Sequence, residues 1–201
     1  MNELADMLIR RNACKDGIAW AQALPEDTSV YNAWRKCPRG DWLLWIANTF
    51  KFNKRQIIYA ACKCARLSLP YAMEGDFRPQ QCLEVVEAWH IGEASINDVL
   101  ASYNTACEAC KDANKASVDS SYYSAASACA TAVANVVYAT AYATHAAPSA
   151  AYVSGYAAWV SSDGDPEEDE EAVMAECARI VRKEIPWRDL KIILQSVYVV
   201  R

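Results

Sequence analysis

The residues best suited to chemistry are arginines and carboxylates in the first half of the chain: Arg39, Asp41, Arg66, Arg78, Glu84 and Glu87. Guanidinium groups bind carboxylates and phosphates through paired hydrogen bonds. Two interpretations follow from this set. The side chains form a partly buried salt-bridge network that fixes how helices cross. Alternatively, they line an anion pocket for a signalling nucleotide, walled by Trp42, Trp45 and Trp89.

Residues 37–45 form a second unusual stretch, which follows shortly after Trp34, a further candidate for the aromatic pocket or core. A proline and a glycine break the chain there, and Asp41 is expected to accept hydrogen bonds from the first free N–H groups of a new helix. Trp42 and Trp45 are three residues apart, so both indoles can enter one core. The stretch is therefore predicted to be the structural centre of the protein.

Catalytic signatures are weak. Paired carboxylates such as Asp41 and Glu84 could support hydrolysis, but no motif places a histidine or lysine beside them. No cysteine has a histidine base in a known signature, and phosphate-loop, nucleophile-elbow and metalloprotease motifs do not occur. We therefore expect a protein without enzymatic activity or cofactor, with a hydrolase using Asp41 and Glu84 as an alternative.

The nine cysteines predict buried, reduced thiols rather than a metal site. Cys62 and Cys64 are two residues apart on an expected helix, which points them about 200° apart. Cys107 and Cys110 share a helix face but lack a second pair of ligands. The two histidines stand in unrelated surroundings, so no metal is expected.

Charge and composition limit the partners. A formal net charge of −5 and a pI near 5.1 argue against general nucleic-acid binding, which needs a basic face. The sequence shows no run close to the roughly 18 apolar residues of a membrane span, and no signal-peptide centre near its start. We expect a cytoplasmic protein whose partner is a protein.

Helical spacing, caps and prolines predict a chain built from helices. The expected helices before the alanine-rich tract span residues 3–10, 12–24, 30–36, 41–50, 54–69 and 78–91. Asn12 and Asn53 are the expected caps of the second and fifth of these helices. Two more helices are expected after the acidic segment, at 166–184 and from 187 onward.

Residues 95–160 form an alanine-rich tract that also contains serine, tyrosine and cysteine. Small residues let helix axes approach closely, so the tract predicts long, tightly packed helices rather than a disordered linker. Breaks are expected near residues 118–121 and at Pro148. The pairs Tyr138 with Tyr142, and Tyr152 with Tyr156, are expected to fill gaps between helices.

Residues 161–171 are acidic and lead into a helix through Asp165 and Pro166, with acid at the positive end of the helix dipole. The order of oxygen ligands required for a calcium loop is not present. Together these patterns predict an all-α, single-domain bundle of many helices over residues 1–201. Its parts are a Trp/Cys-rich half (1–94), the alanine-rich helices (95–160), the acidic loop (161–171) and the C-terminal helices (172–201). A helical-repeat stack is the alternative, but no fixed period is found.

Several segments together resemble a known family. They are 12–14 with Gly17 and Trp20-Ala21, 33–45, 60–66, Arg78-Pro79 with Glu84, Glu87, Ala88 and Trp89, and 92–94 leading into the alanine-rich tract. Over nearly its whole length the chain resembles the all-helical immunity-protein family (immunity protein five-like) encoded in phage and bacterial genomes. The tract here is richer in serine, tyrosine and cysteine, and the acidic loop is a further departure. The resemblance implies a role in conflict between phages and bacteria, in the cytoplasm of a bacterial host cell.

The sequence thus supports two main functional hypotheses. The first is a non-enzymatic inhibitor, immunity or anti-defence factor that binds a macromolecular partner through an acidic helical surface. The second is a protein that sequesters a small anionic ligand such as a signalling nucleotide. The second hypothesis requires Arg66 and Arg78 to face a cavity rather than carboxylates.

Overall fold

The structure is a computed structural model that describes residues 3–116, 121–142 and 144–198, with side chains described for 4–116, 124–142 and 144–194. Eleven α-helices make up 80% of it, and no strand occurs in these ranges. The prediction of an all-α bundle is confirmed. The helices before the alanine-rich tract are α1 (Glu3–Arg10), α2 (Lys15–Gln22), α3 (Val30–Lys36), α4 (Gly40–Thr49), α5 (Lys54–Arg66) and α6 (Arg78–Ile91). The remaining helices are α7 (Ile96–Ala116), α8 (Ser121–Ala141), α9 (Ala147–Ser161), α10 (Pro166–Glu184) and α11 (Trp187–Tyr198).

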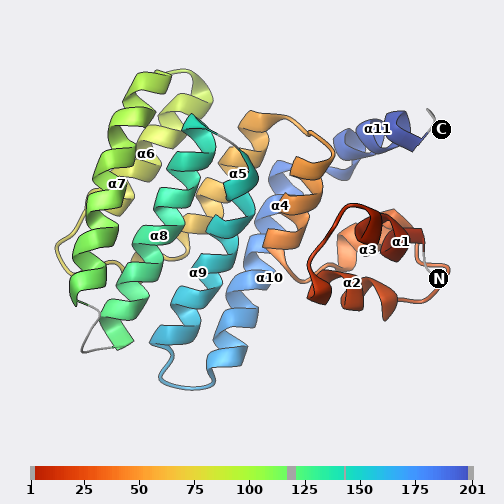
Figure 1. Cartoon of the computed structure of the whole chain (residues 1–201), viewed down its shortest axis with the longest axis horizontal. Coiled ribbons are helices and arrows are strands. Elements are labelled where there is room, and N and C mark those ends of the chain that lie inside the picture. The colour runs from red at the N-terminus through yellow and green to blue at the C-terminus, as the bar shows by residue number, and fades with distance from the viewer. Residues whose placement is uncertain (1–2, 117–120, 143, 199–201) are drawn as a thin grey trace.

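The helices form a layered stack that ends in a small lobe (Figure 1). Helices α6 and α7 lie at one end, α8 comes next, and α5 with α9 and then α4 with α10 follow. Helices α1, α2, α3 and α11 form what we call the end lobe, beyond α4. One hydrophobic cluster runs from Leu4 in α1 through Val133 in α8 to Leu194 in α11, so the lobe and the bundle share a core.

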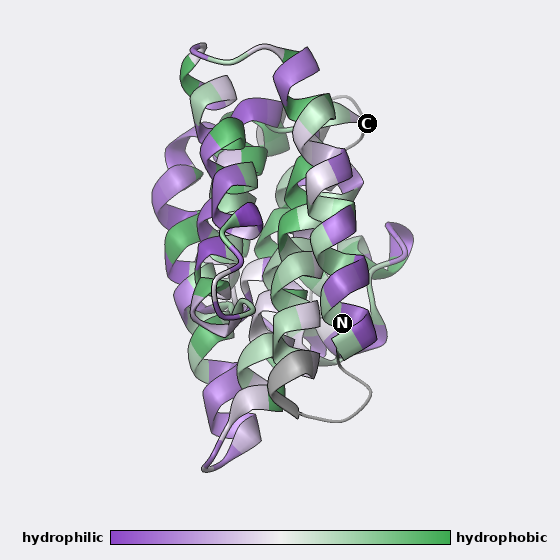
Figure 2. Cartoon of the chain, turned by 90° about the vertical axis from the view of Figure 1, so that its left-hand side faces the viewer, coloured by the Kyte–Doolittle hydropathy of each residue, from purple (hydrophilic) through white to green (hydrophobic). Residues whose placement is uncertain are grey.

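Small residues explain why α7, α8 and α9 pack closely. The buried residues of α9 are alanines, one serine and Gly155, and those of α7 are mostly alanines. Without larger side chains between them, the helix axes can approach. Figure 2 shows that individual helices carry both hydrophilic and hydrophobic residues. The expected long alanine-rich helices are therefore present.

Helix α8 corrects the expectation that the sequence has no apolar run close to the length of a membrane span. Residues Ser124–Ala141 are long and apolar enough, by length and composition alone, to cross a membrane, with a mean hydropathy of 1.2. In the structure, 61% of that window is buried inside the protein. The window is apolar because α8 lies between α7 and α9 and needs few polar residues.

Several helix boundaries differ from the predictions. Helix α2 is capped by Cys14, whose thiol accepts from the N–H of Gly17 at 3.4 Å, and Asn12 instead adopts a left-handed turn with φ 57°. The helix expected over 54–69 ends at Arg66. A 3₁₀ turn, η1 (Leu69–Tyr71), follows it and places the proline in its first turn.

The alanine-rich tract is divided into α7, α8 and α9, whose ends lie near both expected breaks. Pro148 does not break a helix but lies in the first turn of α9, where its missing N–H costs nothing. The chain turns just before it, in the 3₁₀ turn η3 (Thr144–Ala146). Of the break expected near 118–121, residues 117–120 lie outside the described residues, and α8 begins at Ser121.

Candidate functional site

The turn before α4 is held tightly against α10. The guanidinium of Arg182 donates to the carbonyl oxygen of Cys37 at 2.8 Å, and the Cys37 thiol donates to the carbonyl of Arg39 at 3.5 Å. A Cβ on Gly40 would lie 2.4 Å from the Cβ of Cys177 on α10, closer than real Cβ atoms come. Glycine at this position therefore lets α4 and α10 cross.

Asp41 does not cap α4, contrary to the sequence-based expectation. The N-cap position is Arg39, which makes no side-chain cap, and Asp41 lies in the first turn. The Arg39 guanidinium donates to both carboxylate oxygens of Asp41, at 3.1 and 2.9 Å. A bidentate ion pair is a stronger partner than the backbone N–H groups, and it leaves Asp41 without free charge.

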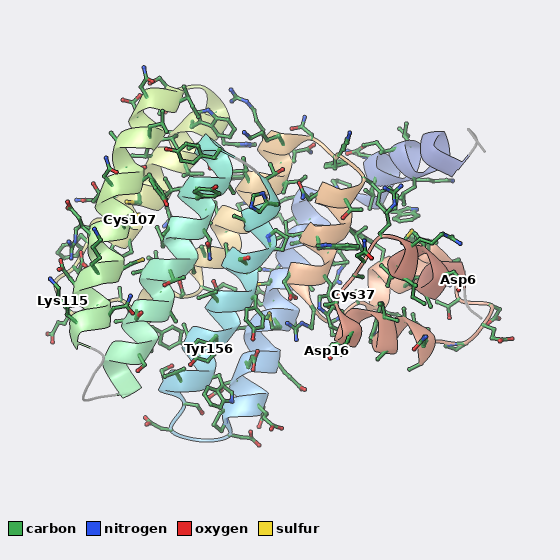
Figure 3. All side chains as sticks on the ribbon, viewed as in Figure 1. Asp6, Asp16, Cys37, Cys107, Lys115 and Tyr156 are labelled. Atoms are coloured by element: carbon green, nitrogen blue, oxygen red, sulfur yellow. The ribbon has the colours of Figure 1, made fainter. Side chains whose placement is uncertain are left out.

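Between the end lobe and the bundle lies a pocket of about 370 Å³, which we call the tryptophan pocket. Its lining residues are Leu8, Asn12, Ala13, Cys14, Gly17, Trp20, Cys37, Asp41, Trp42, Trp45, Ile46 and Pro148. Figure 3 shows Cys37 at this junction of lobe and bundle. The ring centroids of Trp20 and Trp42 are 5.9 Å apart with planes inclined by 51°, so the two pocket indoles pack against each other.

The four predicted tryptophans do not form one wall. Trp42 and Trp45 line the pocket together with Trp20, which sequence reasoning did not select. Trp34 is buried in the end lobe, where its ring lies 6.4 Å from that of Trp187. Trp89 lies on α6 beneath the guanidinium of Arg55, with the guanidinium carbon 4.5 Å from the ring centroid.

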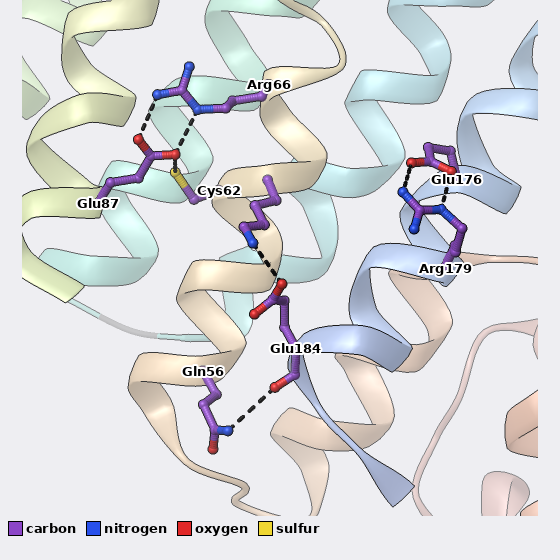
Figure 4. Close-up of polar contacts among 8 residues, drawn as sticks. Gln56, Cys62, Arg66, Glu87, Glu176, Arg179 and Glu184 are labelled. Carbon is purple, nitrogen blue, oxygen red and sulfur yellow. Dashed lines mark hydrogen bonds and ion pairs between the residues drawn. The ribbon is translucent and has the colours of Figure 1, made fainter. Parts of the chain in front are cut away.

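Arg66 is fully engaged by a carboxylate rather than facing a cavity. Its Nε and Nη2 atoms donate to the two oxygens of Glu87, each at 2.6 Å, and the pair links α5 to α6 (Figure 4). This hydrogen bonding raises the pKa of the Arg66 guanidinium. The buried Cys62 thiol donates to the Leu83 carbonyl at 3.7 Å and lies 3.9 Å from Glu87.

Arg78 is paired in the same way. It donates to both carboxylate oxygens of Asp76, at 2.9 and 2.8 Å, and to Asp112 on α7 at 2.9 Å. The hydrogen bonds from Arg78 lower the pKa of Asp76. Because Arg66 and Arg78 both face carboxylates, the predicted arginine-lined nucleotide pocket is wrong. The pairs instead join neighbouring helices, in separate places rather than as one network.

The carboxylates proposed for hydrolysis have different surroundings. Asp41 lines the tryptophan pocket and is paired with Arg39. Glu84 is exposed on α6 and accepts a hydrogen bond from Gln80 at 2.8 Å. No hydrogen bond or ion pair among the described residues joins the two. This arrangement gives a catalytic pair based on Asp41 and Glu84 no support.

The thiols follow the predicted directions. Cys62 faces α6, whereas the Cys64 thiol donates to the carbonyl of Cys177 on α10 at 3.8 Å. Burial raises the pKa of Cys37 to about 12 and that of Cys129 to about 11. Across the described residues, no group of three or more His, Cys, Asp or Glu side chains could hold a metal ion.

An exposed row of aromatic rings on α9 was not predicted. Tyr152, Tyr156 and Trp159 are 47%, 43% and 42% exposed, although the tyrosines were expected to fill gaps between helices. The spacing of four and three residues places them on one side of α9, which we call the aromatic face. The rings of Tyr156 and Trp159 stack with centroids 5.8 Å apart. The small residues that form the buried side of α9, such as Ala151, Ser154, Gly155 and Ala158, were the signal in the sequence that the rings lie on the opposite side.

The aromatic face borders residues 161–171, the acidic segment. A Cβ on Gly155 would lie 3.3 Å from Cγ of Glu170, so the first turns of α10 run close beside α9. In Figure 3, Tyr156 lies on the half of α9 nearest the loop that joins the two helices. The segment contains seven acidic and no basic residues, more than the net charge of −5 for the chain. The excess acidity is therefore concentrated here.

Comparison with protein-family models, with curated proteins and with solved structures gave no match. The resemblance to the immunity-protein family therefore stays a prediction from the quoted residues. The site must be interpreted from its own geometry.

Proposed function

We propose that this protein is a non-enzymatic interaction protein that binds a basic protein partner through the aromatic face and the acidic segment. The observation that carries the proposal is the row of three large exposed rings beside a concentrated negative charge. Aromatic residues are enriched among the few side chains that dominate binding energy at interfaces. The proposal refines the expectation of an acidic helical surface by locating it on α9 and α10.

Charge indicates the kind of partner. The exposed acids of the segment include Glu167, Glu168 and Asp169, which lie in the first turn of α10. Complementary charges at the rim of an interface steer association and exclude wrong partners. A partner with lysines and arginines around an apolar patch fits this surface, because its patch covers the rings while its cations meet the acids.

The resemblance to immunity proteins supports an inhibitory role in conflict between phages and bacteria. Such a role requires only tight, specific binding, with no chemistry in the inhibitor. In this proposal the α9–α10 hairpin blocks the partner by occupying its basic surface.

The proposal is tested by placing a photo-crosslinking amino acid, p-benzoylphenylalanine, at Tyr156 and, as a control, at Ile91. Both side chains are exposed, but Ile91 ends α6, at the opposite end of the stack from the end lobe. In host cells we expect one protein to be captured from position 156 and not from position 91. Equal capture at both positions, or none at position 156, contradicts the proposed surface.

A captured partner allows a quantitative test. Trp159→Ala should weaken binding by about 30-fold, the equivalent of about 2 kcal/mol for an interface hot spot. Ile91→Ala should leave the affinity unchanged. An unchanged affinity for Trp159→Ala would refute the role of the aromatic face.

A further inference from the structure

The tryptophan pocket has a volume typical of small-ligand sites, which are about 300–1,000 Å³. At about 370 Å³ it lies at the small end of that range. Its walls come mainly from α1, α2, α4 and the segments beside them, and from α9 it takes only Pro148. Its lining residues differ from those of the aromatic face, although the Arg39 guanidinium lies over both Trp42 and Tyr152, 4.9 and 5.6 Å from their ring centroids.

The walls of the pocket favour a flat ring. Trp20, Trp42 and Trp45 are each partly exposed, and Leu8 and Ile46 add aliphatic contacts. Aromatic rings stack or pack edge to face with centroids about 4.5–7 Å apart, and each such pair adds to the burial of apolar area. Three indoles around one opening can contact both the face and the edge of a planar guest.

The pocket offers donors but no unpaired charge. Among the described residues, no hydrogen bond joins the indole N–H of Trp20, Trp42 or Trp45 to another residue. The single carboxylate at the pocket, Asp41, is neutralised by Arg39. The Arg39 guanidinium itself lies over the ring of Trp42, 4.9 Å from its centroid. Neither a cation nor an anion would find a free counter-charge there.

We propose that the tryptophan pocket binds a small, planar, uncharged aromatic molecule of one or two fused rings that carries a hydrogen-bond acceptor. The rings would supply most of the contact area, and an indole N–H would meet the acceptor. This ligand class differs from a nucleotide, whose phosphates require unpaired cations.

Cys14 provides a way to detect occupancy. Cys14 lines the pocket, and in the described part of the chain it is the one cysteine that is exposed. A guest in the pocket must restrict the approach of an alkylating reagent to this sulfur. Cys107 on α7 is partly exposed and lies at the far end of the stack, so it serves as an internal reference (Figure 3).

The experiment uses quinoline as the probe at pH 8, where it is uncharged, with the full-length protein. Alkylation by iodoacetamide is followed for each cysteine by peptide mass spectrometry. We expect saturating quinoline to slow alkylation of Cys14 at least threefold while Cys107 is unaffected. Saturation-transfer NMR should show binding of quinoline to the wild-type protein and not to Ala13→Phe, in which a ring fills the pocket.

N-methylquinolinium is the second probe, since it has the same rings but carries a fixed positive charge and has no acceptor lone pair on its nitrogen. We expect it to bind at least tenfold more weakly than quinoline. Equal or tighter binding of the cation overturns the assignment of an uncharged ligand. Absence of both Cys14 protection and an NMR signal with quinoline overturns the site. If Ala13→Phe fails to fold, Trp45→Leu provides the second variant and should also lose quinoline binding.

Discussion

Gly40→Ala tests whether the crossing of α4 and α10 depends on a missing side chain. The new Cβ would lie 2.4 Å from Cβ of Cys177, 2.6 Å from its carbonyl carbon and 2.8 Å from the backbone nitrogen of Ala178. Two of these atoms belong to the α10 backbone, so no rotamer change relieves the contact. The helices must separate, or the turn at Cys37 must shift away from Arg182.

Overpacking of a well-packed core costs about 1–3 kcal/mol, and a contact with backbone belongs at the upper end. We therefore expect Gly40→Ala to lower the free energy of unfolding by about 3 kcal/mol. For a chain of this size that corresponds to a loss of about 6–12 °C in Tm, measurable by circular dichroism.

Gly164→Ala is the matched control, because nothing lies within 4 Å of its added Cβ. Its Tm should stay within about 1 °C of wild type. Adding Cys177→Ala to Gly40→Ala should not restore stability, since the clashing atoms remain. A Gly40→Ala protein as stable as wild type, or rescue by Cys177→Ala, would refute the reasoning.

Three further predictions concern local contributions to stability. Burial raises the pKa values of Cys37 and Cys129 above 9, so their stabilising effect is complete below pH 9 and is lost as pH rises toward 11–12. Urea unfolding from pH 8 to 10 should therefore show a falling free energy of unfolding. In Cys129→Ala this free energy should fall less steeply with pH. Asp165 accepts from two backbone N–H groups of α10, so Asp165→Ala should cost about 1 kcal/mol, whereas Asp163→Ala, which removes the same charge, should cost little; both are measured by thermal unfolding. Glu87→Gln breaks a pair whose side chains are about one-third exposed and should cost about 0.5–1 kcal/mol in urea unfolding, and no loss or a loss above about 2 kcal/mol would contradict that pairing.

Local signals in the sequence predicted the helices well. Asn53 caps α5, Asp165 caps α10, and Gly92 ends α6 in a left-handed conformation, all as expected. These features depend on backbone groups within a few residues, so the residue type carries the information. The fold class followed from the same patterns.

Contacts between distant helices could not be predicted. Asp41 looked like a cap because its position follows a break, but Arg39 competes for its carboxylate. Arg66 and Arg78 were correctly singled out as polar contacts, yet only the packing of α5, α6 and α7 identifies their partners. No local pattern in the sequence shows which helix lies opposite a given arginine.

The surfaces were the hardest feature to foresee. Tyr152 and Tyr156 have a spacing typical of core residues, and only the small buried residues on the other side of α9 show that the rings face outward. The tryptophan pocket combines residues of four helices, so Trp20 of α2 joins Trp42 and Trp45 of α4 only in the folded chain.

The central claim is that the acidic segment binds a basic protein, and the most direct test compares two variants with equal charge. One neutralises Glu167, Glu168 and Asp169 to the corresponding amides. The other neutralises three exposed acids elsewhere: Asp16, Glu93 and Glu108. Affinity for the captured partner is measured by calorimetry at low and physiological salt.

We expect the first variant to lose at least tenfold in affinity at low salt and to show a weaker dependence on salt, because complementary charges are screened by ions. The second variant should bind like wild type. Equal losses of affinity in both variants would mean that net charge alone explains the effect. No loss of affinity in the first variant would contradict the proposed interface.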